Sequence, residues 1–459
     1  MVVFVVLASL DNVVIGLLPP LYRPVAAEFR VTEAALGVVT AVTYLSTAVA
    51  AVAWAYVGDR RRRKPLLLVG TVLWVAGTTA TANVDSFAAF VGAQLLTAAG
   101  LGAIGSVGFS VISDLVAPRR RGLVLAFWGL SQGVGVLCGT LVGGLAGAVD
   151  WRRPFVLLSV AGVGAAVAFA FTYEVRRGHS EPQLAPLFAA GGEYQHRMHR
   201  ADLPVIVARR TNRYLITQGL ISQAALGSLV WLPQLFQARA LDQGYDLPTA
   251  IIIGSVFATV FQLGGALSII GGVVGDRRQR RRPGGRAQVA GWALMAAVPL
   301  YLLLFALPFR VSVAPGSATA GVVRQVLFSL VTEPSIALCF VLAVLAAGLT
   351  SAASPNWYAL VGDVNPPEHR ATVFSLGNLA NGVGRGTGTA LVPLVFRAVS
   401  GFAPPPLNYA LGLALGQLLF VPTGLLYLRA ARTAPHDIAA LDAMLTERAG
   451  VVERGGAVS

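Results

Sequence analysis

Long stretches without charged residues, each about as long as a membrane-spanning helix, recur along the whole chain. A hydrocarbon core about 30 Å thick requires about 20 apolar residues in a helix. Only 12% of the residues are charged, against roughly a quarter in ordinary soluble proteins. The sequence therefore predicts an all-α membrane protein. Twelve spans can be placed, at residues 2–22, 35–57, 66–83, 88–112, 122–148, 154–173, 213–237, 249–274, 287–306, 335–360, 371–397 and 406–429.

The basic residues predict which side of the membrane each loop occupies. Lys and Arg accumulate in cytoplasmic loops, and with a cytoplasmic N-terminus most of the 35 basic residues fall on that side. The clearest clusters are Arg60–Lys64, Arg119–Arg121 and Arg277–Arg286. Arg outnumbers Lys by 34 to one, which suggests a GC-rich bacterial genome. We expect a multi-pass protein of the cytoplasmic membrane with both termini in the cytoplasm.

Two segments of the chain repeat each other. Gly58–Pro65 recurs as Gly275–Pro283, each after the second of six spans. Eight further identities share one offset of 249: Asp114, Pro118, Arg121, Gly133, Val134, Gly135, Gly139 and Thr140 match Asp363, Pro367, Arg370, Gly382, Val383, Gly384, Gly388 and Thr389. The offsets differ because the second half has a long polar external loop at about 307–334. Because the matching loops lie on one side, the halves are parallel repeats.

These repeats define the predicted domain organisation. It consists of an N-terminal six-helix bundle (1–175), a basic cytoplasmic linker (176–211), a C-terminal six-helix bundle (212–430) and a cytoplasmic tail (431–459).

The 6+6 arrangement, with Gly-Asp-Arg-(Xaa)2-Arg-Lys after span 2 and a degenerate copy after span 8, resembles the major facilitator superfamily. The segment Ala55–Lys64 is similar to the corresponding motif of the spinster-like branch, which also has an Asp in span 1 followed by a Leu-Pro pair, here Asp11 and Leu18-Pro19. The resemblance implies a fold of two pseudo-symmetric six-helix bundles and transport by alternating access.

By the same resemblance, the repeated motif forms a cytoplasmic gate. Its acidic residue latches the two halves when the cavity faces outward, through charge-assisted hydrogen bonds. Alternatively, Asp59 only offsets the arginines beside it. The predicted gate residues are Gly58, Asp59, Arg60, Arg63, Lys64, Asp276 and Arg277.

Two ionisable residues lie deep within predicted spans, where charge is costly and usually functional. Asp11 is near the middle of span 1 and Arg385 near the middle of span 11. A carboxyl group away from water is easier to protonate, which suits a proton carrier. An arginine stays charged and offers a fork for a carboxylate or phosphate. We predict proton coupling at Asp11 and anion binding at Arg385, and direct pairing of the two when the site is empty. A static ion pair is the alternative.

Other polar and aromatic residues of the spans can complete a binding site between the halves. Each one alone is more often a contact between helices. Together they favour an amphipathic solute over a small sugar. The predicted substrate-binding residues besides Arg385 are Gln94, Gln132, Asn356, Trp357, Asn378 and Asn381.

Several kinds of function are excluded by motifs that the sequence lacks. It has no phosphate-binding Gly-(Xaa)4-Gly-Lys-Ser/Thr loop, and its two cysteines, Cys138 and Cys339, lie in apolar stretches where neither a disulfide nor a metal site is expected. We therefore expect no enzyme, cofactor, metal or nucleic-acid partner. The expected partners are a small solute, membrane lipids and protons, and the expected state is a monomer.

The sequence thus predicts a proton-coupled secondary transporter of an amphipathic solute resembling an anionic lysophospholipid. A proton-driven multidrug exporter is the alternative. A non-transporting membrane sensor or an intramembrane enzyme would be a protein of a different class.

Overall fold

The computed structural model describes residues 2–58, 61–108, 111, 118–172 and 202–455. All regular elements in these ranges are helices. The longer ones are α1 (Val2–Leu17), α2 (Tyr22–Phe29), α3 (Glu33–Gly58), α4 (Arg63–Ala82), α5 (Phe87–Ala103), α7 (Pro118–Gly147), α8 (Arg153–Ala170), α10 (Asp202–Ala208), α11 (Arg210–Ser228), α12 (Leu232–Asp242), α13 (Leu247–Val260), α14 (Ser268–Arg281), α15 (Gly285–Ala306), α16 (Thr319–Thr332), α17 (Pro334–Ser351), α18 (Ala353–Val364), α19 (Pro367–Val399), α20 (Leu407–Gln417) and α21 (Phe420–Gly455). Short turns η1 (Pro19–Leu21), η2 (Ile104–Gly108), η4 (Leu229–Trp231) and η5 (Leu263–Leu267) connect some of them.

Each of the twelve predicted spans corresponds to a helix or to joined helices in the described ranges. Nine helices or joined helices in the described ranges are long and apolar enough to cross a membrane. The other three predicted spans correspond to α1, α7 and α19. The first of these has only 16 residues before η1 continues it, and the sequence of α19 carries Arg385 and two asparagines.

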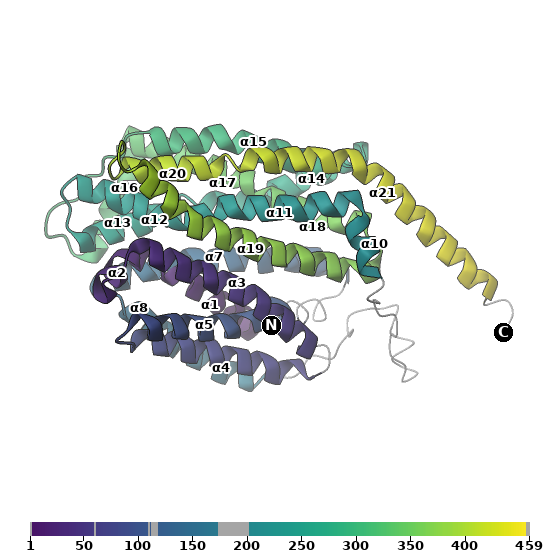
Figure 1. Ribbon diagram of the computed structural model, residues 1–459, viewed down its shortest axis with the longest axis horizontal. Helices are drawn as coiled ribbons and strands as arrows, with labels where there is room; N and C mark the ends of the chain where they lie inside the picture. The colour runs from purple at the N-terminus through teal and green to yellow at the C-terminus, as the bar shows by residue number, and fades with distance from the viewer. Residues whose placement is uncertain (1, 59–60, 109–110, 112–117, 173–201, 456–459) are drawn as a thin grey trace.

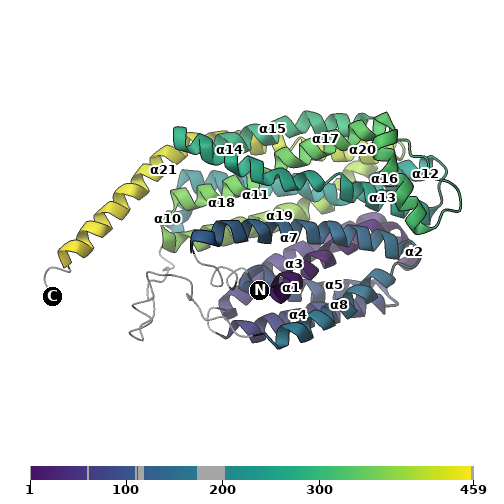
Figure 2. The same ribbon diagram turned by 180° about the vertical axis from the view of Figure 1, so that it is seen from behind.

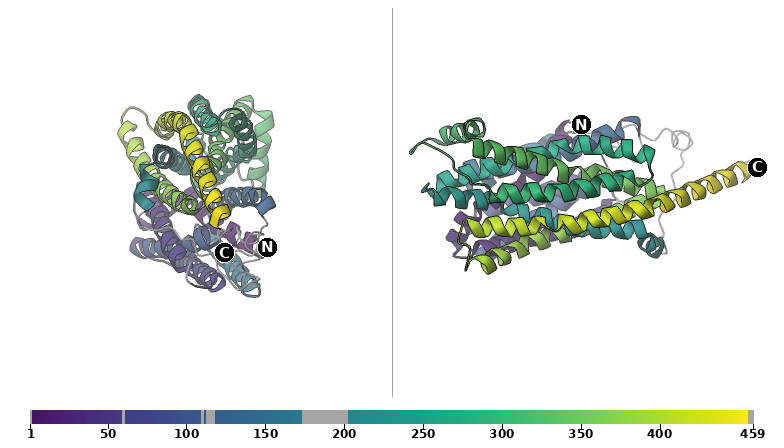
Figure 3. Two further views of the ribbon diagram at one scale, coloured as in Figure 1. Left: turned by 90° about the vertical axis from the view of Figure 1, so that its right-hand side faces the viewer. Right: turned by 90° about the horizontal axis from the view of Figure 1, so that it is seen from above.

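The helices form two groups that run side by side (Figure 1). Helices α1–α8 make one half, and α10–α21 make the other; the view along the helices in Figure 3 separates them. We refer to the end of the bundle that holds α2 and α16 as the α2 end, and to the opposite end as the α10 end.

The internal repeat is visible in the packing of α1 on α7 and of α11 on α19. Glycines let these backbones approach closely. A side chain at Gly16 would meet the backbone of Val136 and Thr140, and one at Gly227 would meet the backbone of Arg385 and Thr389. The same holds for Gly139 against Val13 and for Gly388 against Ala224. Both pairs of contacts follow the offset of 249 between α7 and α19.

Two segments differ from the prediction. The polar loop at 307–334 contains α16, whose Val322 and Val326 are buried although the helix is too short to register as a span. At the end of the last predicted span, α21 continues without a break to Gly455, so one helix joins this span to the predicted cytoplasmic tail and extends beyond the bundle at the α10 end (Figure 1).

Candidate functional site

The two halves meet closely at the α2 end. Helix α1 is followed by the short turn η1, which contains Pro19 and Pro20. Two buried glutamines of α12 bond to the carbonyls of these prolines: Gln234 donates to the Pro19 oxygen, and Gln237 Nε2 donates to the Pro20 oxygen at 2.8 Å. These hydrogen bonds join the halves through backbone atoms.

Aromatic packing surrounds this junction. The rings of Tyr22 and Trp231 meet edge to face at 4.8 Å between centroids, and Trp231 also packs on Phe396 at 5.6 Å. The indole nitrogen of Trp231 donates to the Thr389 carbonyl at 3.0 Å. On α3, Gly37 lies against this indole ring. Trp231 is thus buried between α3 and the second half.

Charged groups form a second contact nearby. Arg23 Nε lies 3.1 Å from Glu33 Oε1, within the first half. The Tyr409 hydroxyl, from the second half, donates to Glu33 Oε2 at 3.2 Å. The Arg23 guanidinium also lies 5.8 Å from the centre of the Tyr409 ring. Hydrogen bonds to charged groups are stronger than neutral ones, so this cluster holds the α2 end closed.

Helices α3 and α19 form the longest contact between the halves. An added side chain at Gly386 would come within 3.0 Å of the Ala41 carbonyl, and one at Gly382 would come within 2.7 Å of the Ala48 side chain. One turn further toward the α10 end, Asn378 is exposed. Figure 1 shows the two helices diverging in that direction. The bundle is therefore tightest at the α2 end.

Arg385 lies at this boundary. Its guanidinium carbon is 5.2 Å from the centre of the Tyr44 ring, on α3 of the other half. Its Nε is buried and has no hydrogen-bond partner among the described residues. A cation stacked on an aromatic ring keeps donors free for a further acceptor.

Asp11 lies elsewhere. It is 4% exposed, and neither of its carboxylate oxygens has a hydrogen-bond partner in the described ranges. Its neighbours one turn before and two turns after, Leu7 and Leu18, are buried in the core. Asp11 and Arg385 form no ion pair in the described part of the chain, so the predicted direct pairing is absent from this conformation. Depth along each span did not reveal that the side chain of Arg385 stacks on Tyr44 of α3 and makes no contact with Asp11 of α1.

Several other predicted binding residues hold helices together. Gln94 Nε2 donates to the Thr81 hydroxyl at 3.1 Å between α5 and α4. Asn356 Nδ2 donates to the Gly271 carbonyl at 3.0 Å. The Trp357 indole donates to the Leu215 carbonyl at 3.2 Å. All three are buried, so in this conformation they serve interhelical packing.

The remaining predicted residues lie on α19 and α7. Asn381 is half-buried, and its side chain faces Gly219 of α11. Asn378 is exposed on the side of α19 that carries Gly382 and Arg385. The side chain of Gln132 lies outside the described residues.

The second copy of the predicted gate motif takes part in a cluster of ion pairs. Arg286 forms ion pairs with Asp363 and, at 2.7 Å, with Asp276. Gln279 Nε2 donates to Asp363 at 3.3 Å. The cluster joins α14, α15 and α18 at the α10 end. The predicted partner Arg277 is exposed instead.

The first copy is described only in part, since Asp59 and Arg60 lie outside the described residues. Gly58 packs on Val107, Arg63 is 9% exposed, and Lys64 Nζ donates to the Thr172 carbonyl at 2.5 Å. The positions of Val107 and Asn356 differ by 249, so the contact of Gly58 with Val107 repeats as Gly275 with Asn356.

Sequence reasoning missed Arg286 and Asp363 in the gate cluster and the contact of Glu33 with Tyr409. A signal existed for the first pair, because Asp363 is one of the repeated residues and Arg286 ends a basic cluster. No sequence pattern connects Glu33 with Tyr409, which are 376 residues apart.

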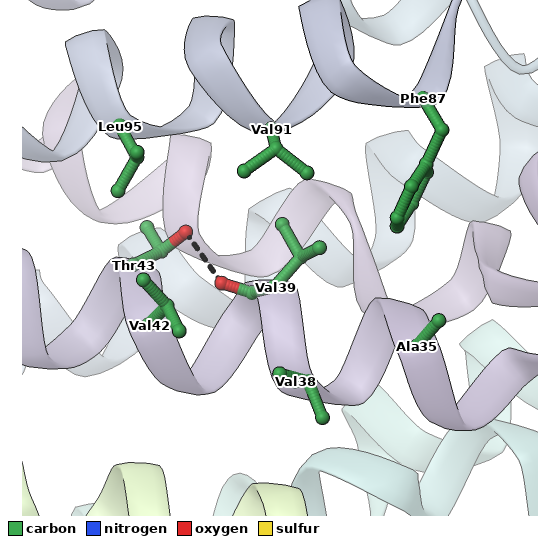
Figure 4. Close-up of a pocket in the computed structure, with 8 residues that line it drawn as sticks. All are labelled: Ala35, Val38, Val39, Val42, Thr43, Phe87, Val91 and Leu95. Atoms are coloured by element: carbon green, nitrogen blue, oxygen red, sulfur yellow. Dashed lines mark hydrogen bonds between the residues drawn. The ribbon is translucent and has the colours of Figure 1, made fainter.

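Two cavities among the described residues lie away from the predicted binding residues. One lies between α3 and α5, has a volume of about 340 Å³ and is lined almost entirely by apolar side chains such as Val38, Val42 and Leu95 (Figure 4). The other lies beside α16 and has a volume of about 850 Å³.

Known proteins support the architecture. The sequence matches the Major Facilitator Superfamily over residues 1–331. It is 23% identical to Protein spinster of Drosophila melanogaster over 279 residues, 60% of this chain and 45% of that protein. It is 26% identical to Sphingosine-1-phosphate transporter SPNS2 of Xenopus tropicalis over 270 residues, 55% and 50% of the two chains. The aligned part thus spans about half the length of these relatives.

A bacterial relative and a solved structure extend the comparison. Multidrug transporter MdfA of Yersinia pestis is 28% identical over 293 residues, 59% of this chain and 65% of that protein. The solved structure is a bacterial homolog of the human lysosomal transporter spinster, in an inward-facing and unoccupied conformation. It shares 20% identity and superposes with a TM-score of 0.73, covering 95% of this chain and 97% of that one.

The family match covers more than half of the chain, and the fold agrees with it, as the motif after span 2 predicted. The chain therefore belongs to the Major Facilitator Superfamily, a family of multi-pass membrane transporters and not of enzymes, and it is similar to spinster proteins.

Proposed function

We propose that the protein transports an amphipathic anion, of the lysophospholipid kind, by proton-coupled alternating access. The observation that carries this proposal is Arg385, a cation at the boundary of the halves whose buried Nε has no partner in the described part of the chain. Its stacking on Tyr44 leaves guanidinium donors for a phosphate or carboxylate. The similarity to a protein named as a sphingosine-1-phosphate transporter supports an anionic lipid-like substrate.

The conformation fits one step of such a cycle. The contacts between the halves concentrate at the α2 end, through Gln237, Trp231 and Tyr409. Basic residues concentrate at the other end, which by the positive-inside rule is cytoplasmic. On this topology, with both termini in the cytoplasm of a bacterial cell, the structure is closed to the outside, and substrate exchanges with the cytoplasm.

We assign proton coupling to Asp11. A buried carboxylate without a partner is costly, and both Asp11 oxygens lack one among the described residues. The neutral, protonated acid is therefore the form that suits this conformation. Because Asp11 and Arg385 do not touch, the proton and the anion act through the movement of helices and not through direct exchange of partners.

We assign the remaining roles by position. Asn378 and Asn381 lie on α19 within three turns of Arg385 and would contact the substrate, with Gln132 at the repeat-related position of Asn381 on α7. Three further predicted residues now make hydrogen bonds between helices: Gln94, Asn356 and Trp357. They can contact substrate only in a conformation in which these hydrogen bonds are broken. The cytoplasmic gate consists of the two copies of the repeated motif, with Gly58, Asp59, Arg60, Arg63 and Lys64 in the first copy and Asp276 and Arg277 in the second. We add Arg286 and Asp363 to this gate.

The test uses purified full-length protein, which we propose is monomeric, in liposomes with an imposed pH gradient. We expect uptake of a labelled anionic lysophospholipid that collapses when the gradient is dissipated. Asp11→Asn should remove the pH dependence, and Arg385→Gln should reduce uptake of the anion. The matched control is Arg397→Gln, which changes an exposed arginine of the same helix. Uptake that survives both substitutions unchanged would overturn the proposal.

A second candidate is the export of apolar drugs driven by protons. The similarity to Multidrug transporter MdfA favours it. The same liposomes distinguish the two candidates, because transport of an uncharged drug should not depend on Arg385, whereas transport of an anion should.

A further inference from the structure

Helix α16 carries an apolar stripe that the protein does not cover. Residues 320, 323, 324, 327, 328 and 331 follow the spacing of one helix face. Phe328 is 64% exposed and Val331 is 78% exposed, with Leu327 at 43%. A single exposed apolar residue needs no explanation, but a contiguous stripe marks a contact surface.

The opposite face of α16 already has its partners. Val322, Val326 and Ser329 are buried, and α16 packs on α13 and α17. The exposed stripe is therefore not a misplaced core face. One face of α16 therefore packs on the protein, and the exposed stripe is available to contact another molecule.

The position of α16 indicates what that is. The helix lies across the α2 end of the bundle, transverse to the spans (Figure 2). An amphipathic helix in this orientation lies at the membrane surface, with its apolar face at the boundary of headgroups and acyl chains. Between the stripe and Leu145 of α7 is the groove of about 850 Å³, a volume within the range of ligand sites.

One cation lies within this apolar surface. Arg324 lines the groove and is exposed. It forms no ion pair or hydrogen bond with any residue in the described ranges. An arginine fork matches the oxygens of a phosphate, and the apolar residues beyond it match an acyl chain.

We propose that this groove binds a phospholipid of the leaflet at the α2 end. The phosphate pairs with Arg324, and an acyl chain lies along Leu327, Phe328 and Val331. Leu145 belongs to the first half and α16 to the second, so the bound lipid touches both halves while the α2 end is closed.

The test uses the full chain in nanodiscs with a trace of phosphatidylglycerol that carries a photoactivatable acyl chain. Illumination should attach this lipid to the peptide that contains Thr319–Thr332. Arg324→Gln should lower the yield on that peptide by up to about fivefold, the factor for about 1 kcal/mol at an exposed ion pair. Phe328→Ser should lower it as well.

Two controls isolate the site. Arg397→Gln and Phe402→Ser change exposed residues of the same types outside the groove and should leave the yield at the parent level. A diacylglycerol with the same photoactivatable chain lacks the phosphate, so it should label α16 weakly. Its yield should be the same in the parent and in Arg324→Gln. Equal labelling by both lipids, an unchanged yield in Arg324→Gln, or cross-linking of α16 to a second copy of the chain would overturn the proposal.

Discussion

The Tyr409 hydroxyl donates a 3.2 Å hydrogen bond to the Glu33 carboxylate, and the two residues belong to opposite halves of the transporter. Glu33 is held by Arg23 of its own half at 3.1 Å, so the cross-boundary bond is made to a carboxylate fixed in position. Arg23 and Glu33 stay together in the first half when the halves separate. The contacts of Tyr409 with Glu33 and with Arg23 are the parts of this cluster that must break for the α2 end to open.

Tyr409→Phe should therefore shift the protein toward a state open at the α2 end. Loss of a hydrogen bond to a charged group costs about 1.5–3 kcal/mol, partly offset by water here because the cluster is only partly buried. The measurement uses a protein in which Cys138 and Cys339 are replaced by serine and spin labels are attached at the exposed positions Val149 and Phe402. Double electron–electron resonance should show a larger population of long distances between the two labels in Tyr409→Phe than in the parent.

Tyr245→Phe is the matched control for that measurement. The Tyr245 hydroxyl donates to the Val311 carbonyl at 2.8 Å and accepts from the Val313 amide at 2.9 Å, all within the second half. Its loss should leave the distances between the halves unchanged. If Tyr409→Phe gave the same distance distribution as Tyr245→Phe, the latch role of Glu33 and Tyr409 would be rejected.

The close approach of α1 and α7 gives a second prediction. Gly139→Ala would place a carbon 2.9 Å from the Gly16 Cα and against the Val13 carbonyl, and such overpacking costs about 1–3 kcal/mol. Gly388→Ala, at the repeat-related position, should cost a similar amount. Gly133→Ala lies on the same helix, and its added carbon would meet no atom of another helix within 4 Å in the described part of the chain, so helix propensity should make it neutral or stabilising by up to about 1 kcal/mol.

Thermal unfolding in detergent checks this order. We expect both Gly139→Ala and Gly388→Ala to unfold below the parent, and Gly133→Ala at or above it. A loss of stability in Gly133→Ala as large as in Gly139→Ala would mean that glycine flexibility, and not close approach, explains the pattern.

Much of this fold could be predicted from the sequence, because hydropathy and charge report on the membrane directly. The repeat offset of 249 between span 5 and span 11 even anticipated matching contacts, as Gly139 with α1 and Gly388 with α11 show. The helix α16 could not be predicted in the same way, since 14 residues with Arg324 and Gln325 fall below the length of a span.

The site was harder to predict, because position along a span gives depth but not direction. Asp11 and Arg385 have similar predicted depths, yet Asp11 is buried in the first half without a partner among the described residues, and Arg385 stacks on Tyr44. A polar residue in a span is equally ambiguous: Gln94 and Asn356 bond to neighbouring helices. Only tertiary contacts distinguish a polar residue that lines a binding site from one that holds two helices together.

The gate cluster gives a third prediction. Arg286 neutralises two carboxylates, Asp276 and Asp363, so Arg286→Gln leaves them facing each other without a cation. Because the Asp276 side chain is 49% exposed, we expect a modest loss of about 1 kcal/mol in unfolding free energy. Arg277→Gln changes an adjacent, exposed arginine and should stay within about 0.5 kcal/mol of the parent.

Salt dependence separates a charge effect from a packing effect in that comparison. At 1 M salt the Debye length falls to about 3 Å, so the difference between Arg286→Gln and the parent should shrink. A difference that is equal at low and high salt would show that Arg286 acts through packing of its aliphatic stem.

The stacking of Arg385 on Tyr44 gives the last prediction, which concerns substrate charge. Arg385→Lys keeps the cation but loses the planar fork, so it should retain part of the transport of an anionic lysophospholipid. Arg385→Gln removes the charge and should raise the KM for this lipid by about tenfold, the factor for about 1.4 kcal/mol. Tyr44→Leu removes the ring and the cation–π contact, worth about 0.5–2 kcal/mol, but keeps the charge, so its effect on KM should be smaller than that of Arg385→Gln.

Initial rates in liposomes measure both effects, with an anionic lysophospholipid and with a lysolipid of the same chain length that has no phosphate. Equal sensitivity of the two lipids to Arg385→Gln would show that the guanidinium supports the contact of α3 with α19 and does not bind the anion.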